Sequence, residues 1–402
     1  MTERLYYTDS HLTHFDARVV AVNEMDGGRS AVLLNRTAFY PTGGGQPTDT
    51  GTLGAARVVE CIDREEAGVI HVIEGPAPQV GSNITGRVDW PRRLDHIQQH
   101  TGQHILSQAF VKLFGAETRS FRMMEDFSEI DVALDDPSDE RIERAVDLAN
   151  QIIWEDRAVC ARQFTADEAA RLPLRKDVAR AGELRIIEIE DFDMTPCGGT
   201  HARRTGEVGL VAVRSWERAK GLARIDFVAG ARALADYRRV NREARQVAAL
   251  FSVGRDEAAA AASRMFEENK NLLRRQRALE EQAARAEADE LLAGAIQRPD
   301  GARIIARLFD DRDMDALRKL AQAIIARPRM IALLGARDSE AARLVFARSE
   351  DLSDDMSAIM RAACGMIDGR GGGRPSLAQG GGRATERLHE VLDHCLKKCG
   401  AP

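Results

Sequence analysis

The sequence predicts an α+β fold in four consecutive parts: a small N-terminal β-barrel, an α/β domain, a helical segment and a C-terminal α/β domain. Two observations on composition support this prediction. Short apolar runs broken by Gly, Asp and Pro fill residues 1–88, whereas residues 236–296 consist almost entirely of helix-forming residue types. The length of 402 residues also exceeds that of one ordinary domain, so several hydrophobic cores are expected.

Residues 1–88 are predicted to form the barrel domain. Apolar residues alternate or cluster there in short runs that are typical of strands, and turn-forming residues separate the runs. The runs are Ala17–Val22, Ala31–Leu34, Ala56–Cys61 and Val69–Ile73. Strands as short and as closely spaced as these favour a small closed sheet.

Residues 89–235 are predicted to form the α/β domain. Pro91 begins a helical period of apolar residues that ends near Phe114, and Ser138 is placed to cap a second helix that runs to Trp154. Three strands are expected after these helices, at Leu184–Ile189, Val208–Val213 and Ala223–Val228. Because both segment types are substantial, we expect a mixed domain that packs helices on strands.

The remainder of the chain is predicted as a helical segment and a last α/β domain. Residues 236–296 should form one or two long helices, arranged as a hairpin or coiled coil or as a plain linker. Residues 297–402 contain a glycine-rich segment, residues 369–382. Two buried strands and a final helix are expected around it, at Arg303–Leu308, Met330–Gly335 and Ala384–Lys398.

The composition is that of a protein without a membrane-spanning segment. No apolar run approaches the ~20 residues that a membrane-spanning helix needs, and Met1–Ser10 lacks the basic and apolar regions of a signal peptide. Six cysteines are too sparse for a disulfide framework in a chain of this size, which suits a reducing compartment. We therefore expect a cytoplasmic location and no membrane partner.

The net charge is weak evidence on whether the protein binds a nucleic acid. The formal net charge is −6, whereas nucleic-acid-binding proteins are usually basic. Local basic patches can nevertheless bind phosphates. Arg370, Arg374 and Arg383 form one such group among glycines, which would let a nucleic acid approach the backbone closely. The alternative is that each group of arginines is an ordinary solvated surface.

Two short motifs indicate a metal site. His100-Thr-Gly-Gln-His104 lies in the first predicted helix, where residues four apart share one face. Cys197-Gly-Gly-Thr-His201 follows a predicted strand, and its glycines permit a tight turn that brings both side chains toward one point. Three imidazoles and one thiolate form a ligand set suited to zinc. His96, one turn before His100, is a competing ligand, but a supporting or surface role fits it better.

These two motifs and their spacing resemble the editing domain shared by alanyl-tRNA synthetases and the free-standing AlaX proteins. The segment from Thr37 to Gly51, which contains Pro-Thr-Gly-Gly-Gly-Gln46, is similar to the glycine-rich signature of the N-terminal barrel in that family. Leu5–Ser10 and Lys220–Phe227 are similar as well, and the C-terminal part resembles the last domain of alanyl-tRNA synthetase. The resemblance covers nearly the whole chain and points to the long form of AlaX.

The resemblance implies a deacylase that acts on mischarged alanine tRNA, with serine as the implied amino acid and glycine as a second candidate. The reaction would be hydrolysis of the ester at the terminal ribose, with zinc polarising the carbonyl or activating a water. No synthetase catalytic core precedes the barrel, so editing in trans is expected. In one departure from the family, Arg122 stands where a histidine is often found.

Thr37 and Gln46 are the candidates for recognising the substrate. We expect them to contact the serine hydroxyl and the terminal adenosine, because a hydroxyl-specific hydrogen bond discriminates where apolar contact does not. The alternative for this segment is a simple turn around Pro41-Thr-Gly-Gly-Gly. The role of zinc is open as well, since four protein ligands are typical of structural sites and catalytic sites usually keep one position free.

Two other functions fit the same motifs. One is a non-catalytic tRNA-binding protein with a structural zinc, and the other is a hydrolase of a different aminoacyl ester. The C-terminal half also has two interpretations. It binds tRNA through its arginines and so raises the overall affinity, or it holds two copies of the chain together as a homodimer.

Overall fold

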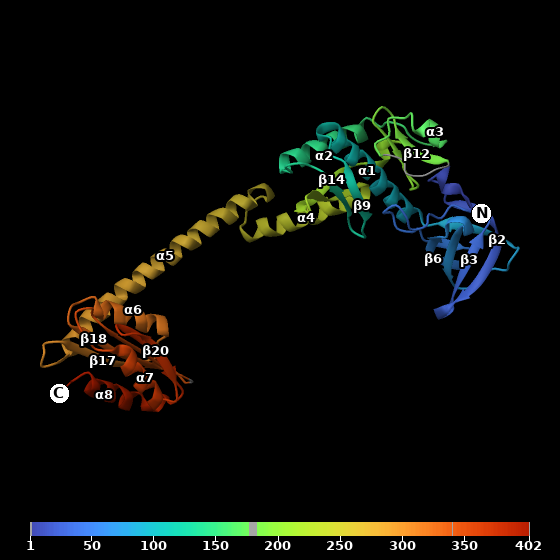
Figure 1. Ribbon diagram of the computed structural model, residues 1–402. Coiled ribbons are helices and arrows are strands. Elements are labelled where there is room, and N and C mark those ends of the chain that lie inside the picture. Colours follow the sequence, from blue (N-terminus) through green and yellow to red (C-terminus); the bar gives the residue numbers. More distant parts are fainter. Residues whose placement is uncertain (1, 177–182, 340, 402) are drawn as a thin grey trace. The chain divides into compact units, whose positions relative to one another are not determined.

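The chain divides into two compact units, Met1–Gln246 and Val247–Pro402. The computed structural model describes residues 2–176, 183–339 and 341–401. Helices and strands occur in both units, so the predicted α+β class is confirmed (Figure 1). Within these described ranges, no helix is both long and apolar enough to cross a membrane.

A closed six-stranded barrel begins the first unit. Its antiparallel strands neighbour one another in the order β2-β3-β7-β6-β5-β8. They are β2 (His14–Met25), β3 (Arg29–Leu34), β5 (Gly51–Leu53), β6 (Ala56–Asp63), β7 (Val69–Glu74) and β8 (Asn83–Val88). Alternate side chains, among them Phe15, Val32 and Ile73, fill the interior. The barrel predicted from the sequence is present, and each of the four apolar runs lies within one of its strands. Two short strands, β1 (Glu3–Arg4) and β4 (Arg36–Thr37), pair in parallel beside it.

Two helices follow the barrel. α1 (Trp90–Phe114) has a proline in its first turn and ends at Gly115, which adopts the left-handed conformation that glycine favours. α2 (Asp139–Trp154) begins at Ser138, whose hydroxyl accepts a hydrogen bond from the Arg141 backbone. Local capping residues therefore set the ends of these helices, and for this reason the sequence predicted them closely.

Two antiparallel sheets complete the first unit. One has the order β14-β15-β10-β9 and the other the order β11-β12-β13. The elements are β9 (Thr118–Met123), β10 (Ser128–Val132), β11 (Val159–Phe164), α3 (Ala166–Ala169), β12 (Leu184–Ile189), β13 (Asp193–Pro196), β14 (Val211–Ala219) and β15 (Leu222–Ala229). Ile105, Ile152 and Phe227 belong to the buried cluster that joins α1 and α2 to the four-stranded sheet. This core holds α1 against the strands that follow it.

One strand begins later than the sequence predicted. β14 starts at Val211, because Thr205–Val208 form a 3-10 turn instead of extended backbone. The Asn150 side-chain amide bonds both the N–H and the C=O of Val211. The apolar run at residues 208–213 therefore contains the end of a turn and only the beginning of a strand.

The helical segment consists of two helices. α4 (Gly230–Leu250) lies mostly in the first unit and α5 (Ala258–Leu291) lies in the second, with Gly254 in the turn between them. The boundary that we expected at residue 235 therefore falls inside α4. The hairpin or coiled coil stays a prediction.

A six-stranded sheet forms the centre of the second unit, in the order β16-β17-β18-β19-β21-β20. α6 (Met314–Ile325) packs on one face, whereas α7 (Met356–Met366) and α8 (Leu388–Lys398) pack on the other (Figure 1). The strands are β16 (Ile296–Gln297), β17 (Arg303–Asp310), β18 (Met330–Arg337), β19 (Ala342–Arg348), β20 (Arg370–Arg374) and β21 (Leu377–Gly382). The two predicted buried strands are the parallel pair β17 and β18, and the last helix begins at Leu388 because a 3-10 turn precedes it.

The glycine-rich segment forms the hairpin of β20 and β21 at the edge of this sheet. α7 lies directly on the hairpin. A Cβ atom at Gly371 or Gly380 would lie 2.6 or 2.4 Å from the Cys364 sulfur, which is closer than real Cβ atoms approach. At these two positions glycine therefore serves close helix packing, whereas the sequence had suggested the approach of a nucleic acid.

Candidate metal centre

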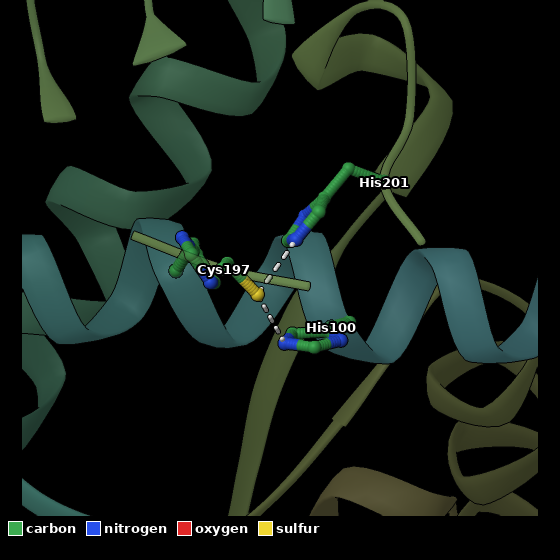
Figure 2. A group of neighbouring side chains, drawn as sticks. His100, Cys197 and His201 are labelled. Carbon is green, nitrogen blue, oxygen red and sulfur yellow. Dashed lines mark hydrogen bonds between the residues drawn. The ribbon is translucent and has the colours of Figure 1, made fainter. Parts of the chain in front are cut away.

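Four side chains from two distant segments meet beside α1. His100 and His104 project from α1, while Cys197 and His201 belong to the loop that follows β13. Their candidate ligand atoms all lie within 4.8 Å of one another. Figure 2 shows the Cys197 sulfur between the rings of His100 and His201. The structure thus brings together all four residues that the sequence predicted as ligands.

The spacing of the ligand atoms fits a single ion. Nε2 of His100 lies 3.4 Å from the Cys197 sulfur, and Nε2 of His201 lies 3.3 Å from it. In a tetrahedral zinc site with Zn–N of about 2.0 Å and Zn–S of about 2.3 Å, neighbouring ligand atoms lie roughly 3.3–3.6 Å apart. The two nitrogen–sulfur distances match this spacing, and three imidazoles with a sulfur suit zinc in their chemistry.

The charges of the cluster favour metal binding. Burial alone would raise the pKa of the Cys197 thiol, but His100 and His201 lower it well below its ordinary value. Burial holds the pKa of His201 well below its ordinary value, so this ring is neutral. For His104, burial alone would lower the pKa, but contacts with Asp193 and Cys197 raise it. A thiolate is the form of cysteine that binds metal, and an imidazole binds metal through an unprotonated nitrogen.

Gln46 binds the second nitrogen of His100. Its Oε1 accepts a hydrogen bond of 2.8 Å from Nδ1 of His100 and one of 3.2 Å from the Thr200 backbone. Its Nε2 donates to the Thr200 hydroxyl at 2.9 Å. Thr200 thus orients the amide, and the amide keeps the proton of His100 on Nδ1, which leaves Nε2 free for a metal. Gln46 therefore contacts a candidate ligand, although the sequence had suggested contact with the substrate.

The other two histidines also have partners behind the cluster. Nδ1 of His201 lies 3.4 Å from the hydroxyl oxygen of Thr101. Nδ1 of His104 lies 3.4 Å from a carboxylate oxygen of Asp193. His100 and His201 thus turn Nε2 toward the sulfur, and each of the three imidazoles turns Nδ1 toward a different polar side chain. Neither Thr101 nor Asp193 was predicted from the sequence in this role, although both lie within four residues of a predicted ligand.

Thr37 lies in β4, beside the barrel, and not in this cluster. Its side chain is fully buried, and its hydroxyl lies 2.8 Å from Nε2 of His71 and accepts a hydrogen bond from the Phe39 backbone. A serine substrate would have to reach this buried hydroxyl to contact it. The expected contact of Thr37 with serine stays a prediction.

Arg185 holds the loop that carries Cys197. Its guanidinium donates to the carbonyl oxygens of Cys197 at 2.8 Å, Gly199 at 2.9 Å and Tyr7 at 3.0 Å. A Cβ atom at Gly199 would lie 2.2 Å from Cε1 of His100. Glycine is thus needed in this loop for close approach to α1. Arg185 was not predictable from the sequence, because an arginine within a strand carries no signal of this contact.

A buried ion pair joins the barrel to α1. Arg93 and Asp49 have almost no exposed surface, and the Arg93 guanidinium donates to the Asp49 carboxylate and to two backbone carbonyls. His96 is buried beside them, with Nδ1 4.0 Å from Asp49, and does not belong to the metal cluster. The pair sets the start of α1 against the loop that carries Gln46.

Cys197 is the most exposed residue of the cluster. This residue is partly exposed, whereas only 2–4% of the surface of each of the three histidines is accessible. A polar hollow of about 340 Å³ lies beside His201, and its lining includes His11, Arg185 and Arg203. A hollow of this size accepts a small ligand or part of a larger one.

The predicted arginine group comes together only in part. Arg370 and Arg374 occupy alternate positions of β20, so they share one face, and Gly372 between them borders open space. Arg383 follows the end of β21 and is exposed. In the part of the chain that the structure describes, none of these three side chains forms a hydrogen bond or an ion pair.

Three known protein families match successive parts of the chain. Residues 2–92 match the tRNA synthetases of class II (A), and residues 184–226 match the second additional domain of threonyl and alanyl tRNA synthetases. Residues 301–400 match the DHHA1 domain. The second match includes Cys197 and His201.

Individual relatives extend over nearly the whole chain. The alanine–tRNA ligase of Pyrobaculum neutrophilum is 34% identical over 94% of this chain, and that of Pyrobaculum calidifontis is 33% identical over 98%. This chain spans only 42% and 44% of those two ligases. The alanyl-tRNA editing protein AlaX-L of Pyrococcus horikoshii is 31% identical over 99% of this chain and 98% of its own. Because this likeness covers almost all of both proteins, the chain belongs to the AlaX-L family of alanyl-tRNA editing proteins.

Proposed function

We propose that this protein hydrolyses the aminoacyl ester of mischarged alanine tRNA in trans, with serine as the preferred amino acid and glycine as a second one. The observation that carries the proposal is the convergence of three imidazoles on one sulfur, in a chain similar to an editing protein. A zinc ion held by His100, His104, Cys197 and His201 would polarise the ester carbonyl or lower the pKa of a bound water.

The residues around the cluster would bind and orient the end of the tRNA. The hollow beside His201 would receive the terminal nucleotide, because it borders the cluster and polar residues line it. Gln46 would act through His100, while Thr37 remains the candidate for recognising the serine hydroxyl.

The second candidate function is tRNA binding with a structural zinc. Four protein ligands favour it, because catalytic zinc normally keeps one coordination position free. The hollow beside His201 favours hydrolysis, because it leaves space for a substrate next to one of the four residues. The two functions therefore differ in whether the ester is cleaved and not in whether tRNA binds.

A deacylation assay separates these functions. The substrates are alanine tRNA charged with serine, glycine or alanine, and each is tested before and after zinc removal by a chelator. We expect rapid release of serine, slower release of glycine, retention of alanine, and loss of activity that added zinc restores. Binding of charged tRNA without release would support the structural role, and release from an unrelated tRNA would support a hydrolase of a different ester.

We also propose that Arg370, Arg374 and Arg383 contact tRNA phosphates. Arginines that have no partner among the described residues are free to pair with phosphates, and two of these three share one face of an edge strand. The alternative for this half is a homodimer. Met265, Leu272 and Leu279 favour it, because they are exposed along α5 at intervals of seven residues, a spacing typical of paired helices. Sedimentation of the whole chain with and without tRNA distinguishes the two.

A further inference from the structure

We infer that Asp193 is a positioning residue of the metal centre, whose carboxylate fixes the ring of His104 so that Nε2 faces the metal. This inference rests on the proposed metal centre and concerns a residue that contacts one of the four proposed ligands. His104 itself was predicted from the sequence, but its partner was not.

The geometry at His104 leaves one candidate partner. Nδ1 is buried and makes no well-aligned hydrogen bond in the described part of the chain, and its recorded polar neighbour is Oδ2 of Asp193 at 3.4 Å. A buried N–H without a partner costs on the order of 1–3 kcal/mol. A histidine that binds metal through one nitrogen almost always donates its other N–H to a carboxylate, a carbonyl or a water. The carboxylate of Asp193 stands where that acceptor is needed.

The surroundings of Asp193 hold this carboxylate in place. Its side chain has no exposed surface. Arg175 donates to its two oxygens at 2.8 and 3.2 Å, and the Thr195 hydroxyl lies 2.9 Å from each oxygen. A buried carboxylate is costly unless it is paired, and Arg175 supplies the pair. The carboxylate is therefore fixed in position and carries its charge behind His104.

Asp193 differs in charge from the partners of the other two histidines. The acceptor for His100 is the amide of Gln46, and the neighbour of His201 is a hydroxyl, so both are neutral. An anionic acceptor makes the imidazole a stronger ligand than a neutral one does. Asp193 also begins β13, which leads directly to Cys197. The same short strand therefore places the sulfur ligand and the acceptor of His104.

The test measures zinc affinity in the whole protein by competition with a chromophoric chelator, together with the absorption spectrum of bound cobalt(II). Asp193→Asn keeps the shape of the side chain and removes the charge, and it should weaken zinc binding on the order of 10–100-fold. Thr195→Val keeps the Arg175 pair and frees the carboxylate from one contact, so a smaller loss in the same direction is expected. Asp131→Asn is the matched control, because Asp131 pairs with Arg224 away from the cluster.

The possible results separate this inference from the function proposed above. Wild-type zinc affinity and an unchanged cobalt spectrum in Asp193→Asn would overturn the role of Asp193. If Asp193→Asn does not fold, unchanged affinity and spectrum in Thr195→Val would overturn it instead. A wild-type protein that binds neither zinc nor cobalt would overturn the metal centre and this inference together. Full zinc affinity without ester hydrolysis would overturn only the proposed reaction.

Discussion

The metal centre and the glycine-rich hairpin use glycine and polar side chains in opposite ways. At the metal centre, Gly199 lets a ligand approach, and the polar groups behind the ligands face partners within the chain. In the hairpin, Gly371 receives a helix, while Arg370 and Arg374 have no partner among the described residues. The first arrangement is organised before anything binds, which suits a small ion. The second leaves its charges available, and under the proposed function a large and flexible partner would pair with them.

The largest expected effect in this comparison comes from removing a ligand. Cys197→Ala should reduce zinc from about one ion per chain to nearly none and abolish ester hydrolysis, because the thiolate carries the negative charge of the set. Elemental analysis and the deacylation assay measure both quantities. Cys160→Ala is the control, since that cysteine is exposed and lies outside the cluster. Full zinc content in Cys197→Ala would contradict the ligand assignment.

A smaller effect is expected from replacing Gln46, the neutral hydrogen-bond acceptor of His100. Gln46→Met removes the partner of His100 Nδ1 and should lower zinc affinity on the order of tenfold, so that serine and glycine release slow equally at limiting zinc. Chelator competition and paired deacylation rates give the result. A rise in KM for tRNA with zinc affinity unchanged would instead place Gln46 against the substrate.

A substitution at Thr37 tests whether the N-terminal domain recognises the amino acid. Thr37→Val should slow serine release by a factor on the order of ten, matching ~1–3 kcal/mol for an unpaired polar partner, and leave glycine release unchanged. The same change removes the hydroxyl that lies beside His71, so some thermal stability should be lost in either case. Equal slowing with both substrates would show that Thr37 serves the barrel and not recognition.

The smallest effect on the reaction is expected in the hairpin. Replacing Arg370, Arg374 and Arg383 by alanine should leave kcat unchanged and weaken tRNA binding, with each lost phosphate contact reducing the slope of log affinity against log salt by roughly one. Binding measured over a range of salt concentrations gives the slope. Arg387→Ala is the control, because that arginine already pairs with Glu390. An unchanged slope in the triple variant would remove the hairpin from the tRNA interface.

The sequence revealed features whose signal is local. His100 and His104 share a helical face at a fixed spacing, and Ser138 caps its helix through a neighbour three residues away. Apolar alternation likewise gave the barrel strands. Each of these follows from residues that are close in the chain, so it was predictable without knowledge of the fold.

Features that depend on distant contacts were not predictable in the same way. In the sequence, Arg185 is an ordinary residue of a predicted strand. Its three backbone acceptors, two in the loop and one at Tyr7, lie close to it only in the folded chain. In the sequence, Asp193 looks like a turn residue. Its contact with His104 exists only in the folded chain. Gln46 was identified from a resemblance, but its contact with His100 spans 54 positions of sequence. A motif thus indicated that Gln46 matters, and only the fold shows what it touches.

The contact between Gln46 and His100 has a consequence for how the molecule unfolds. It joins the barrel to the helix that carries two ligands, and the buried pair of Arg93 and Asp49 crosses the same boundary. Whatever binds only the folded cluster then stabilises the barrel too, by ~2.7 kcal/mol at a free zinc concentration 100 times the Kd. Barrel amides such as that of Val58 in β6, more than forty residues before the first ligand, should therefore exchange their hydrogens more slowly once the ion is bound.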